Sequence, residues 1–436
     1  MGTVLETLTR ELAIAKVRSW PEWLSQQSGQ SAIAAAFAEP PTAVVYPTSE
    51  TELAEVIAWA DREGRRTVVT GQGSKLSWGA PAACDVLICT TEINRVIRHA
   101  VGDLTVTAEA GARFADVQAK LSQERQCLAL DPLYPDQATL GGIVATADAG
   151  ALRQRYGGVR DMLIGLTFVR ADGQSAKAGG QVVKNVAGYD LMKLMTGAYG
   201  TLGALSQLTF RTYPLAETSQ TLVMGGAPAA SAAVLLAFKL SGLTPVAFDL
   251  LSPALMAALG LPRHLGLALR FQGIPDAVAE QVARAHQFAA DLPGQDFVGE
   301  QDSACWQTSA DQISRPDERD RLLIKFGLLP NAAVDWFTQI EAVIHPSWAG
   351  RIHIGSGLGL LSIDPDAKND KNLADMLIKL RSQCEARRGF LTLLQAPSEV
   401  KARVSVWGTP SGLPLMRQIK QQFDAKNLLG PGRFVT

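Results

Sequence analysis

A short glycine-rich segment, TVVTGQGSKLSWG, carries residue types that could bind a phosphate. Gly71 and Gly73 allow the backbone to come close to a ligand, and the Ser74 hydroxyl and the Lys75 ammonium add two donors. Leu76 stands where a Rossmann fingerprint would have its third glycine, and no helical pattern follows at once. The segment therefore predicts a phosphate-binding loop of another kind, although a tight strand-to-strand turn explains these residues equally well.

The elements around this segment alternate between strand and helix patterns. Ser49 and Glu52 form a capping box, and the apolar residues that follow keep helical spacing up to Gly64. Residues 67–70 have the composition of a short strand that runs directly into the glycines. Residues 104–110 alternate as in a half-buried strand, and a helical period comes next. These patterns predict an α+β domain that positions the glycine loop.

Two later segments are also unusually rich in glycine. The first, DPLYPDQATLGGIVATADAGALRQRYGGVRDMLIGLTFVRADG, contains an ATLGG step and an RYGGVRD step. The second, GGQVVKNVAGYDLMKLMTGAYGTLGALSQLTF, contains a GTLG step before a strand pattern. So many glycines would not stabilise a helical bundle or the core of a β-sandwich. We therefore interpret them as places where the backbone approaches a ligand.

Taken in order, the three segments resemble the FAD-binding oxidases and dehydrogenases of the vanillyl-alcohol oxidase type, also called the PCMH fold. In that family the ATLGG-like step lies along the flavin and its phosphates. The resemblance covers roughly residues 40 to 217 and implies FAD as the cofactor. The FAD-binding residues that it implies are Thr70, Gly71, Gln72, Gly73, Ser74, Lys75, Leu76, Pro135, Ala138, Thr139, Leu140, Gly141, Gly142, Ala145, Arg155, Tyr156, Gly157, Arg160, Asp161, Gly200, Gly203, Ala204 and Leu205.

The phrase KNVAGYD narrows this resemblance to the FAD-binding subunits of glycolate oxidase, the E subunits. The C-terminal DAKNLLGPGRF is similar to the closing DP-x-x-x-x-NPGR of these subunits, with Ala425 and Gly430 as departures. The resemblance implies oxidation of glycolate to glyoxylate in a complex. The expected partners are a second FAD subunit and an iron–sulfur subunit, which receive the electrons.

The flavin of this family is sometimes attached through a histidine beside the first phosphate loop. That loop reads TGQGS here, and His99 is well downstream, so we expect non-covalent FAD. Lys184 and Asn185 are candidates for tuning the flavin, because a nearby cation favours a reduced, anionic ring. Pairing of Lys184 with an acidic neighbour is an equal alternative.

Oxidation of a 2-hydroxy acid requires a base for the hydroxyl proton and a cation for the carboxylate. Catalytic flavin subunits of this group carry an HxGDGNxH-like cluster, and the nearest segment here is RIHIGSGLGLLSI. Arg351 and His353 are present, but the second histidine and the acidic residue are missing. The candidate catalytic residues are therefore His353, Arg351 and Lys184, while the commoner role for His353 is a sheet residue with a satisfied hydrogen bond. Two alternatives stay open: a self-sufficient FAD-dependent D-lactate or 2-hydroxy-acid dehydrogenase, and a non-catalytic flavin-fold scaffold.

A chain of 436 residues predicts two or three domains. After residue 217 the strand and helix patterns suggest β-α-β-β-α-β units, which predict a ferredoxin-like antiparallel-sheet cap domain. The expected order is an N-terminal helix and connector at 1–36, a two-part PCMH-type FAD-binding domain at 37–217, the cap at 218–405, and a segment at 406–436 that returns to the FAD domain.

The composition limits the classes of partner that we expect this chain to bind. With 41 basic and 42 acidic residues, the chain has no overall field to attract nucleic acid or anionic lipid. Its five cysteines are scattered and form none of the close pairs of metal sites, so we expect reduced thiols and no bound metal. No signal-peptide pattern or bilayer-length apolar stretch occurs. We expect a cytoplasmic protein that meets the inner face of a membrane only through its partner subunits.

Overall fold

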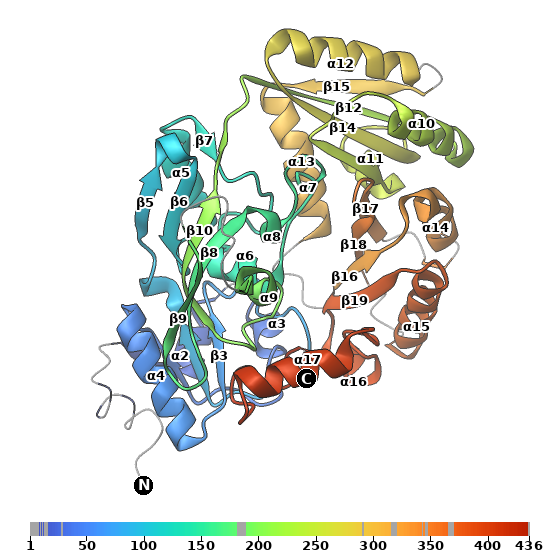
Figure 1. The fold of residues 1–436 in the computed structure, drawn as a ribbon. Coiled ribbons are helices and arrows are strands. Elements are labelled where there is room, and N and C mark those ends of the chain that lie inside the picture. Colours follow the sequence, from blue (N-terminus) through green and yellow to red (C-terminus); the bar gives the residue numbers. More distant parts are fainter. Residues whose placement is uncertain are drawn as a thin grey trace. The chain divides into compact units, whose positions relative to one another are not determined.

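The computed structural model describes residues 8, 10, 12, 16–27, 29–180, 189–289, 292–314, 321–341, 343–344, 348–364 and 370–434. The chain forms two compact units. Figure 1 shows the fold, coloured from blue at the N-terminus to red at the C-terminus. None of the described helices combines the length and the apolar character that a bilayer crossing requires. The first unit comprises Met1–Ala149, Gly158–Leu215 and Thr409–Thr436, and the second comprises Gly150–Gly157 and Ala216–Gly408.

The first unit contains a four-stranded sheet with three parallel strands and one antiparallel edge strand. Its strands, in spatial order, are β1 (Val17–Ser19), β2 (Ala43–Val45), β4 (Val86–Cys89) and β3 (Thr67–Thr70). Two short helices, α2 (Trp20–Leu24) and α3 (Gln30–Ala34), follow β1. The sequence predicted a helix and a connector here and missed β1. The prediction of a strand at 67–70 is confirmed, and the glycine loop leaves its carboxyl end.

Helix α4 (Glu50–Glu63) connects β2 to β3, and local signals in the sequence set both of its ends. The Ser49 side chain accepts a hydrogen bond from the Glu52 backbone N–H at its start. Gly64 ends the helix in the left-handed conformation, with φ of 62°. Leu53, Val56 and Ile57 are buried in the core, which confirms the predicted apolar face.

A second sheet of the first unit is antiparallel throughout. Its strand order is β5 (Val96–Ala100), β6 (Thr105–Glu109), β10 (Ala204–Arg211), β8 (Leu163–Val169) and β9 (Ser175–Gly179). The predicted strand at 104–110 is confirmed as β6, and the helical period after it as α5 (Phe114–Ser122). The remaining elements are β7 (Gln126–Cys127), paired with β11 (Tyr213–Pro214), and helices α6 (Leu140–Thr146), α8 (Val159–Met162) and α9 (Leu191–Met195).

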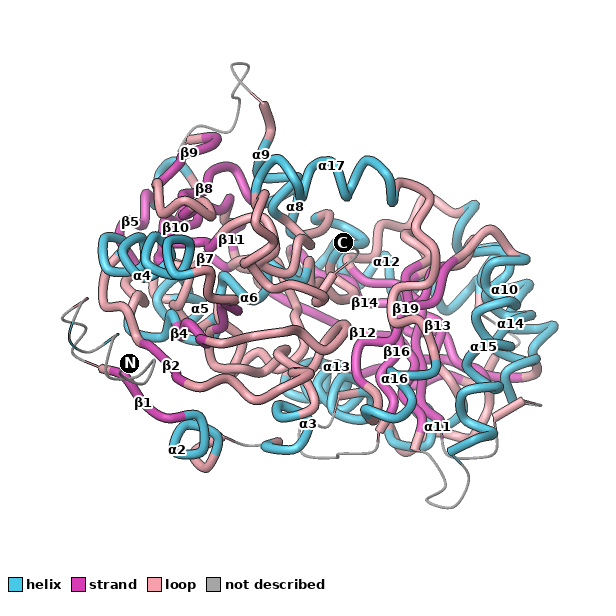
Figure 2. The backbone as a smooth tube through the Cα atoms, turned by 90° about the horizontal axis from the view of Figure 1, so that it is seen from below, coloured by secondary structure: helices cyan, strands magenta, loops and turns pink. Residues whose placement is uncertain are grey.

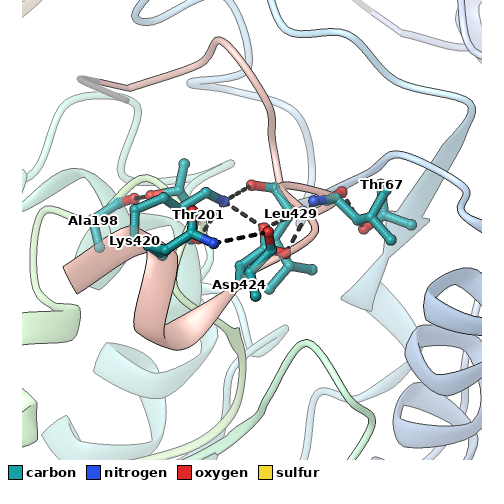
Figure 3. A network of polar contacts seen from close by, with 9 residues as sticks. Thr67, Ala198, Thr201, Lys420, Asp424 and Leu429 are labelled. Atoms are coloured by element: carbon teal, nitrogen blue, oxygen red, sulfur yellow. Dashed lines mark hydrogen bonds and ion pairs between the residues drawn. The ribbon is translucent and has the colours of Figure 1, made fainter. Parts of the chain in front are cut away.

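The C-terminal segment belongs to this first unit. Helix α17 (Leu413–Phe423) lies in this segment, and the chain then pairs with β3 through a parallel bridge between Thr67 and Leu429. Figure 3 shows the buried Lys420 ammonium, which donates to the backbone oxygens of Thr201 (2.9 Å) and Leu429 (2.8 Å) and to the Asp424 carboxylate. The segment around Leu429 is thus anchored beside the glycine-loop strand.

The second unit is built from two ferredoxin-like halves, as predicted. The second half follows the β-α-β-β-α-β order, and the first half has the same order with one further helix, α11, between β13 and β14. The two halves join at the antiparallel pair β13–β17 into one eight-stranded sheet. The spatial order of the sheet is β15 (Gly294–Val298), β12 (Thr218–Gly226), β14 (Leu265–Gly273), β13 (Ala247–Leu251), β17 (Trp348–His353), β18 (Leu358–Ile363), β16 (Leu322–Gly327) and β19 (Phe390–Gln395).

Helices pack against the strands of this sheet. Figures 1 and 2 show α10, α14 and α15 beside the strands, and Phe238 of α10 meets Phe248 of β13 with ring centroids 5.9 Å apart. Because side chains alternate along a strand, the neighbouring Asp249 points to the opposite face. The helices of this unit are α7 (Arg153–Tyr156), α10 (Pro228–Leu240), α11 (Pro253–Ala258), α12 (Pro275–Phe288), α13 (Glu300–Ile313), α14 (Ala333–Glu341), α15 (Asp370–Ala386) and α16 (Ser398–Arg403).

Candidate functional site

A pocket in the first unit brings together three glycine-containing segments that are far apart in the sequence. It holds about 680 Å³ of space free of protein atoms, part of it open to solvent. The predicted residues that line it are Thr70, Gly71, Gln72, Gly73, Ser74, Lys75, Leu76, Thr139, Gly141, Gly142, Ala145, Gly200, Gly203, Ala204 and Leu205.

Glycine is required in the walls of this pocket because the segments touch through their backbones. A Cβ atom on Gly71 would lie 2.2 Å from Thr139 Oγ1. On Gly141 it would lie 2.9 Å from the Ala110 backbone oxygen, and the Gly141 N–H donates to that same oxygen at 2.7 Å. The glycine loop and the start of α6 therefore pack without room for a side chain between them.

The glycine loop presents backbone donors that the protein itself does not use. Among the described residues, the N–H groups of Gln72, Gly73 and Ser74 have no protein acceptor. Successive unused N–H groups in a glycine-containing loop form the kind of concavity that binds phosphate oxygens. The loop thus presents donors that could bind the pyrophosphate of a dinucleotide.

The sequence suggested that the Lys75 ammonium donates to a phosphate, but in the structure it forms an ion pair within the protein. Its Nζ atom lies 3.0 Å from Asp148 Oδ2, and both side chains are buried. Asp148 Oδ2 also accepts a hydrogen bond of 2.9 Å from the Leu133 N–H. The carboxylate offsets the ammonium charge at the edge of the pocket. Sequence reasoning missed Asp148 because no local pattern links it to Lys75.

Sequence reasoning did not place the C-terminal Arg433 in this pocket. Arg433 lines the pocket and donates through Nη2 to the backbone oxygens of Lys75 (3.3 Å) and Leu76 (2.6 Å). Burial lowers the pKa of Arg433 to about 10, against the opposing effects of Tyr199 and Cys84. The GPGR motif could have drawn attention to it. The other lining residues that were missed are Val69, Thr90, Ala110, Thr146 and Tyr199.

Several predicted FAD residues do not line this pocket. Ala138 and Leu140 are fully buried in the protein interior, and Pro135 lies outside the lining. Asp161 accepts a hydrogen bond of 2.8 Å from the Gly158 N–H, which orders the start of α8. The remaining residues of the RYGGVRD step also lie outside the lining, and three of them cluster with the second unit. Their contact with the flavin stays a prediction; these residues are Arg155, Tyr156, Gly157 and Arg160.

The candidate catalytic residues His353 and Arg351 lie on β17 in the second unit. His353 is paired in register with Asp249 of β13, and its Nδ1 atom lies 2.7 Å from Asp249 Oδ1. Both side chains are buried. Nδ1 thus has the satisfied hydrogen bond of an ordinary sheet histidine, whereas Nε2 has no protein partner among the described residues. Lys184 and Asn185 lie outside the described residues.

Two buried polar atoms next to His353 also lack partners. Within the described part of the chain, neither Arg351 Nε nor Asp249 Oδ2 has a hydrogen-bond partner. Such groups are costly in a folded protein unless a ligand, ion or water satisfies them. A molecule that offers an acceptor to Arg351 and a donor to Asp249 would give both atoms a hydrogen-bond partner. A 2-hydroxy acid has both groups, in its carboxylate and its hydroxyl.

Comparisons with known proteins agree with the geometry of the pocket. Residues 41–179 match the family described as an FAD binding domain. Glycolate oxidase subunit GlcE of Escherichia coli (strain K12) is 35% identical over 156 residues, which cover 36% of this chain and 44% of that protein. D-lactate dehydrogenase of Archaeoglobus fulgidus is 24% identical over 435 residues, covering 90% of this chain and 91% of that protein. The match to GlcE thus spans less than half of that relative.

The solved structure of p-cresol methylhydroxylase superposes with a TM-score of 0.77 and covers 98% of this chain and 95% of that chain at 14% identity. At this identity the likeness concerns the fold alone. Most of the pocket-lining residues fall within the matched range 41–179, where the backbone donors and the clash-prone glycines lie. The chain has the PCMH-type FAD-binding fold that the sequence predicted, and FAD is its cofactor.

Proposed function

We propose that this chain is an FAD-dependent oxidoreductase that oxidises the CH–OH group of a 2-hydroxy acid. The observation that carries the proposal is the buried Asp249–His353 pair beside Arg351. The unpartnered atoms Arg351 Nε and Asp249 Oδ2 match the acceptor and donor groups of such an acid. FAD, when bound, supplies the acceptor for the two electrons.

The three polar residues take distinct roles in this proposal. Arg351 binds the substrate carboxylate through its guanidinium group, as arginine commonly does. Asp249 accepts a hydrogen bond from His353 Nδ1, so that Nε2 is the nitrogen that can take the hydroxyl proton. The third candidate, Lys184, stays a prediction from the sequence.

Our first candidate reaction is oxidation of glycolate to glyoxylate by this chain as the FAD-binding subunit of a glycolate oxidase complex. The similarity to GlcE, which is named as a glycolate oxidase subunit, supports it. A second FAD subunit and an iron–sulfur subunit would then accept the electrons, in the cytoplasm or at the inner face of a membrane. We propose that FAD is held non-covalently, because the TGQGS loop contains no histidine.

A specific observation favours a second candidate, a self-sufficient D-lactate dehydrogenase. The similarity to the Archaeoglobus fulgidus D-lactate dehydrogenase extends over 90% of this chain, whereas the similarity to GlcE covers 36%. The intact Asp249–His353 pair is compatible with turnover by this chain alone. The two candidates differ in whether the chain needs partners to reduce its flavin.

An anaerobic titration separates these candidates. The purified chain is mixed with glycolate or D-lactate while the visible flavin band is followed. Bleaching of the chain alone supports the self-sufficient enzyme, and bleaching only after partner subunits are added supports the complex. Arg351→Met should abolish the bleaching, whereas Arg381→Met, which removes a guanidinium that donates to Leu391 and Ser405 elsewhere in the same unit, should retain it. Bound FAD that neither acid reduces under either condition would favour a scaffold and overturn the proposal.

A further inference from the structure

The second unit contains a cavity whose lining includes neither the residues of the flavin pocket nor the Asp249–His353 pair. All of its lining residues belong to this unit. The centres of water-sized molecules can reach about 250 Å³ of it, whereas one buried water needs roughly 15 Å³ on the same measure. We propose that this cavity binds a small aromatic carboxylic acid that also carries a hydrogen-bond donor. This second ligand site is independent of the proposed oxidation of a 2-hydroxy acid.

The cavity lies on the face of the eight-stranded sheet that packs against α10. Phe248 of β13 and Leu269 of β14 are cross-strand neighbours in its wall. Ile354 follows β17, and its N–H donates to the Phe248 oxygen at 2.8 Å. Phe248 and Asp249 are consecutive in β13, so their side chains point to opposite faces of the sheet. A ligand in the cavity is thus separated by the sheet from a substrate bound at Asp249.

Apolar side chains form much of the cavity wall. Phe238 of α10 packs against Phe248, with ring centroids 5.9 Å apart and ring planes at 79°. Leu243, Leu269 and Ile354 extend the apolar surface around these two rings. Aromatic rings attract one another more strongly than their buried area alone accounts for. These walls therefore favour a ligand with an aromatic body.

Two exposed cations lie at the edge of the cavity. Lys239 is one of the lining residues. Arg284 is close to the turn that follows α10, because a Cβ atom on Gly242 would lie 3.8 Å from Arg284 Nη2. Gly242 lies between Ser241 and Leu243, which line the cavity. Within the described part of the chain neither cation forms an ion pair, so the two charges favour a ligand with an anionic group, of which a carboxylate is the simplest case.

Gln154 of α7 adds a hydrogen-bond acceptor. Its side chain lines the cavity, and its Oε1 atom is buried without a hydrogen-bond partner among the described residues. The amide lies against Gly355, where a Cβ atom would be 1.9 Å from Oε1. An unsatisfied buried carbonyl oxygen is costly, and a ligand N–H or O–H that reached it would offset that cost. The ligand should therefore carry a donor as well as an acid group.

The test compares three aromatic ligands of similar size on the FAD-loaded protein. Indole-3-acetate has the ring, the acid and an N–H donor, whereas indole-3-acetamide lacks the charge and naphthalene-1-acetate lacks the donor. Each Kd is read from a saturation-transfer NMR titration. Lys239→Glu reverses one exposed charge and should raise the Kd for indole-3-acetate about tenfold, while the Kd for indole-3-acetamide stays within about twofold. Gln154→Leu should raise the Kd for indole-3-acetate about fivefold, as for loss of one hydrogen bond, and change that for naphthalene-1-acetate less than about twofold.

Lys379→Glu is the matched control, because Lys379 is an exposed lysine of α15 in the same unit that lies outside the cavity lining. It should leave every Kd within about twofold of the wild type, as expected for a residue remote from the ligand. Equal effects of the two lysine substitutions would show a general charge effect and overturn the proposal. The absence of saturable binding, or Kd values that neither Lys239→Glu nor Gln154→Leu changes, would also overturn it. None of these outcomes depends on whether a 2-hydroxy acid reduces the flavin.

Discussion

Asp249 and His353 form a buried hydrogen bond of 2.7 Å between Oδ1 and Nδ1, across the neighbouring strands β13 and β17. The carboxylate fixes which ring nitrogen carries the proton, and it would stabilise the imidazolium formed when Nε2 accepts a proton. Asp249→Asn keeps the shape of the side chain and removes this control. We expect the anaerobic rate of flavin reduction by the 2-hydroxy acid to fall roughly 100-fold or more, a typical loss for impaired general-base catalysis.

The measurement is rapid mixing of acid with oxidised protein, with partner subunits present if the chain requires them. Asp335→Asn serves as the control, since Asp335 pairs with Arg387 on the surface of the same unit. FAD content should be unchanged in both variants. Reduction of Asp249→Asn at the wild-type rate would show that the pair only stabilises the sheet.

The glycine loop provides a second prediction, based on the space between Gly71 and Thr139. A Cβ atom at residue 71 would lie 2.2 Å from Thr139 Oγ1, so Gly71→Ala must displace either the loop or the start of α6. Because both segments line the pocket, we expect FAD affinity to fall at least about tenfold, as for the loss of roughly 1.4 kcal/mol of binding free energy. The Kd for FAD is measured by fluorescence quenching.

Gly102→Ala is the matched substitution in the same unit. A Cβ atom there meets nothing within 4 Å, so FAD affinity and thermal stability should stay close to those of the wild type. An unchanged Kd for FAD in Gly71→Ala would mean that Thr139 yields without disturbing the pocket.

Local signals in the sequence were sufficient for much of the fold. The Ser49 cap and the left-handed Gly64 lie within the segment that they delimit, so the bounds of α4 could be predicted from neighbouring residues. The glycine-rich segments were identified through motif resemblance, and the pocket brings them together.

The contacts that define the sites were not predictable in this way. Lys75 meets Asp148, and His353 meets Asp249, because strand order and register bring distant segments together. Arg433 reaches the loop because Leu428–Gly430 extends beside β3. No periodicity or short spacing encodes these pairings. A single sequence therefore shows the residue types of the sites but not the partners that determine their charge.

The cysteine thiols lead to a third prediction. Burial raises the pKa of all five thiols, to about 12 for Cys84, Cys305 and Cys384. Since the thiolate is the reactive form, we expect reaction with Ellman's reagent at pH 8 to be at least about 100-fold slower in the native protein than in guanidinium chloride. Cys127 is half-buried and should react first, so Cys127→Ser should remove the fastest phase. A rapid native reaction that persists in this variant would contradict the burial of the other thiols.

Lys420 leads to the last prediction, the pH dependence of stability. Burial lowers the pKa of Lys420 below its ordinary value of 10.5, although the hydrogen bond to Asp424 opposes the shift. Between the lowered pKa and 10.5 the unfolded chain binds more protons than the folded chain, so this residue makes the free energy of unfolding rise with pH. Its contribution is fully present above 10.5 and is lost as the pH falls through the folded-state pKa.

Urea unfolding of wild type and Lys420→Met measures this contribution at a series of pH values from neutral upward. At pH 7 the variant should lose about 3 kcal/mol, because the buried Asp424 carboxylate is left without its cation. The difference between wild type and variant should then grow as the pH rises toward 10.5. Lys193→Met removes the exposed partner of Asp190 and should change stability by less than about 0.5 kcal/mol at every pH. A difference that stays constant or shrinks with pH would show that the Lys420 pKa is not lowered in the folded protein.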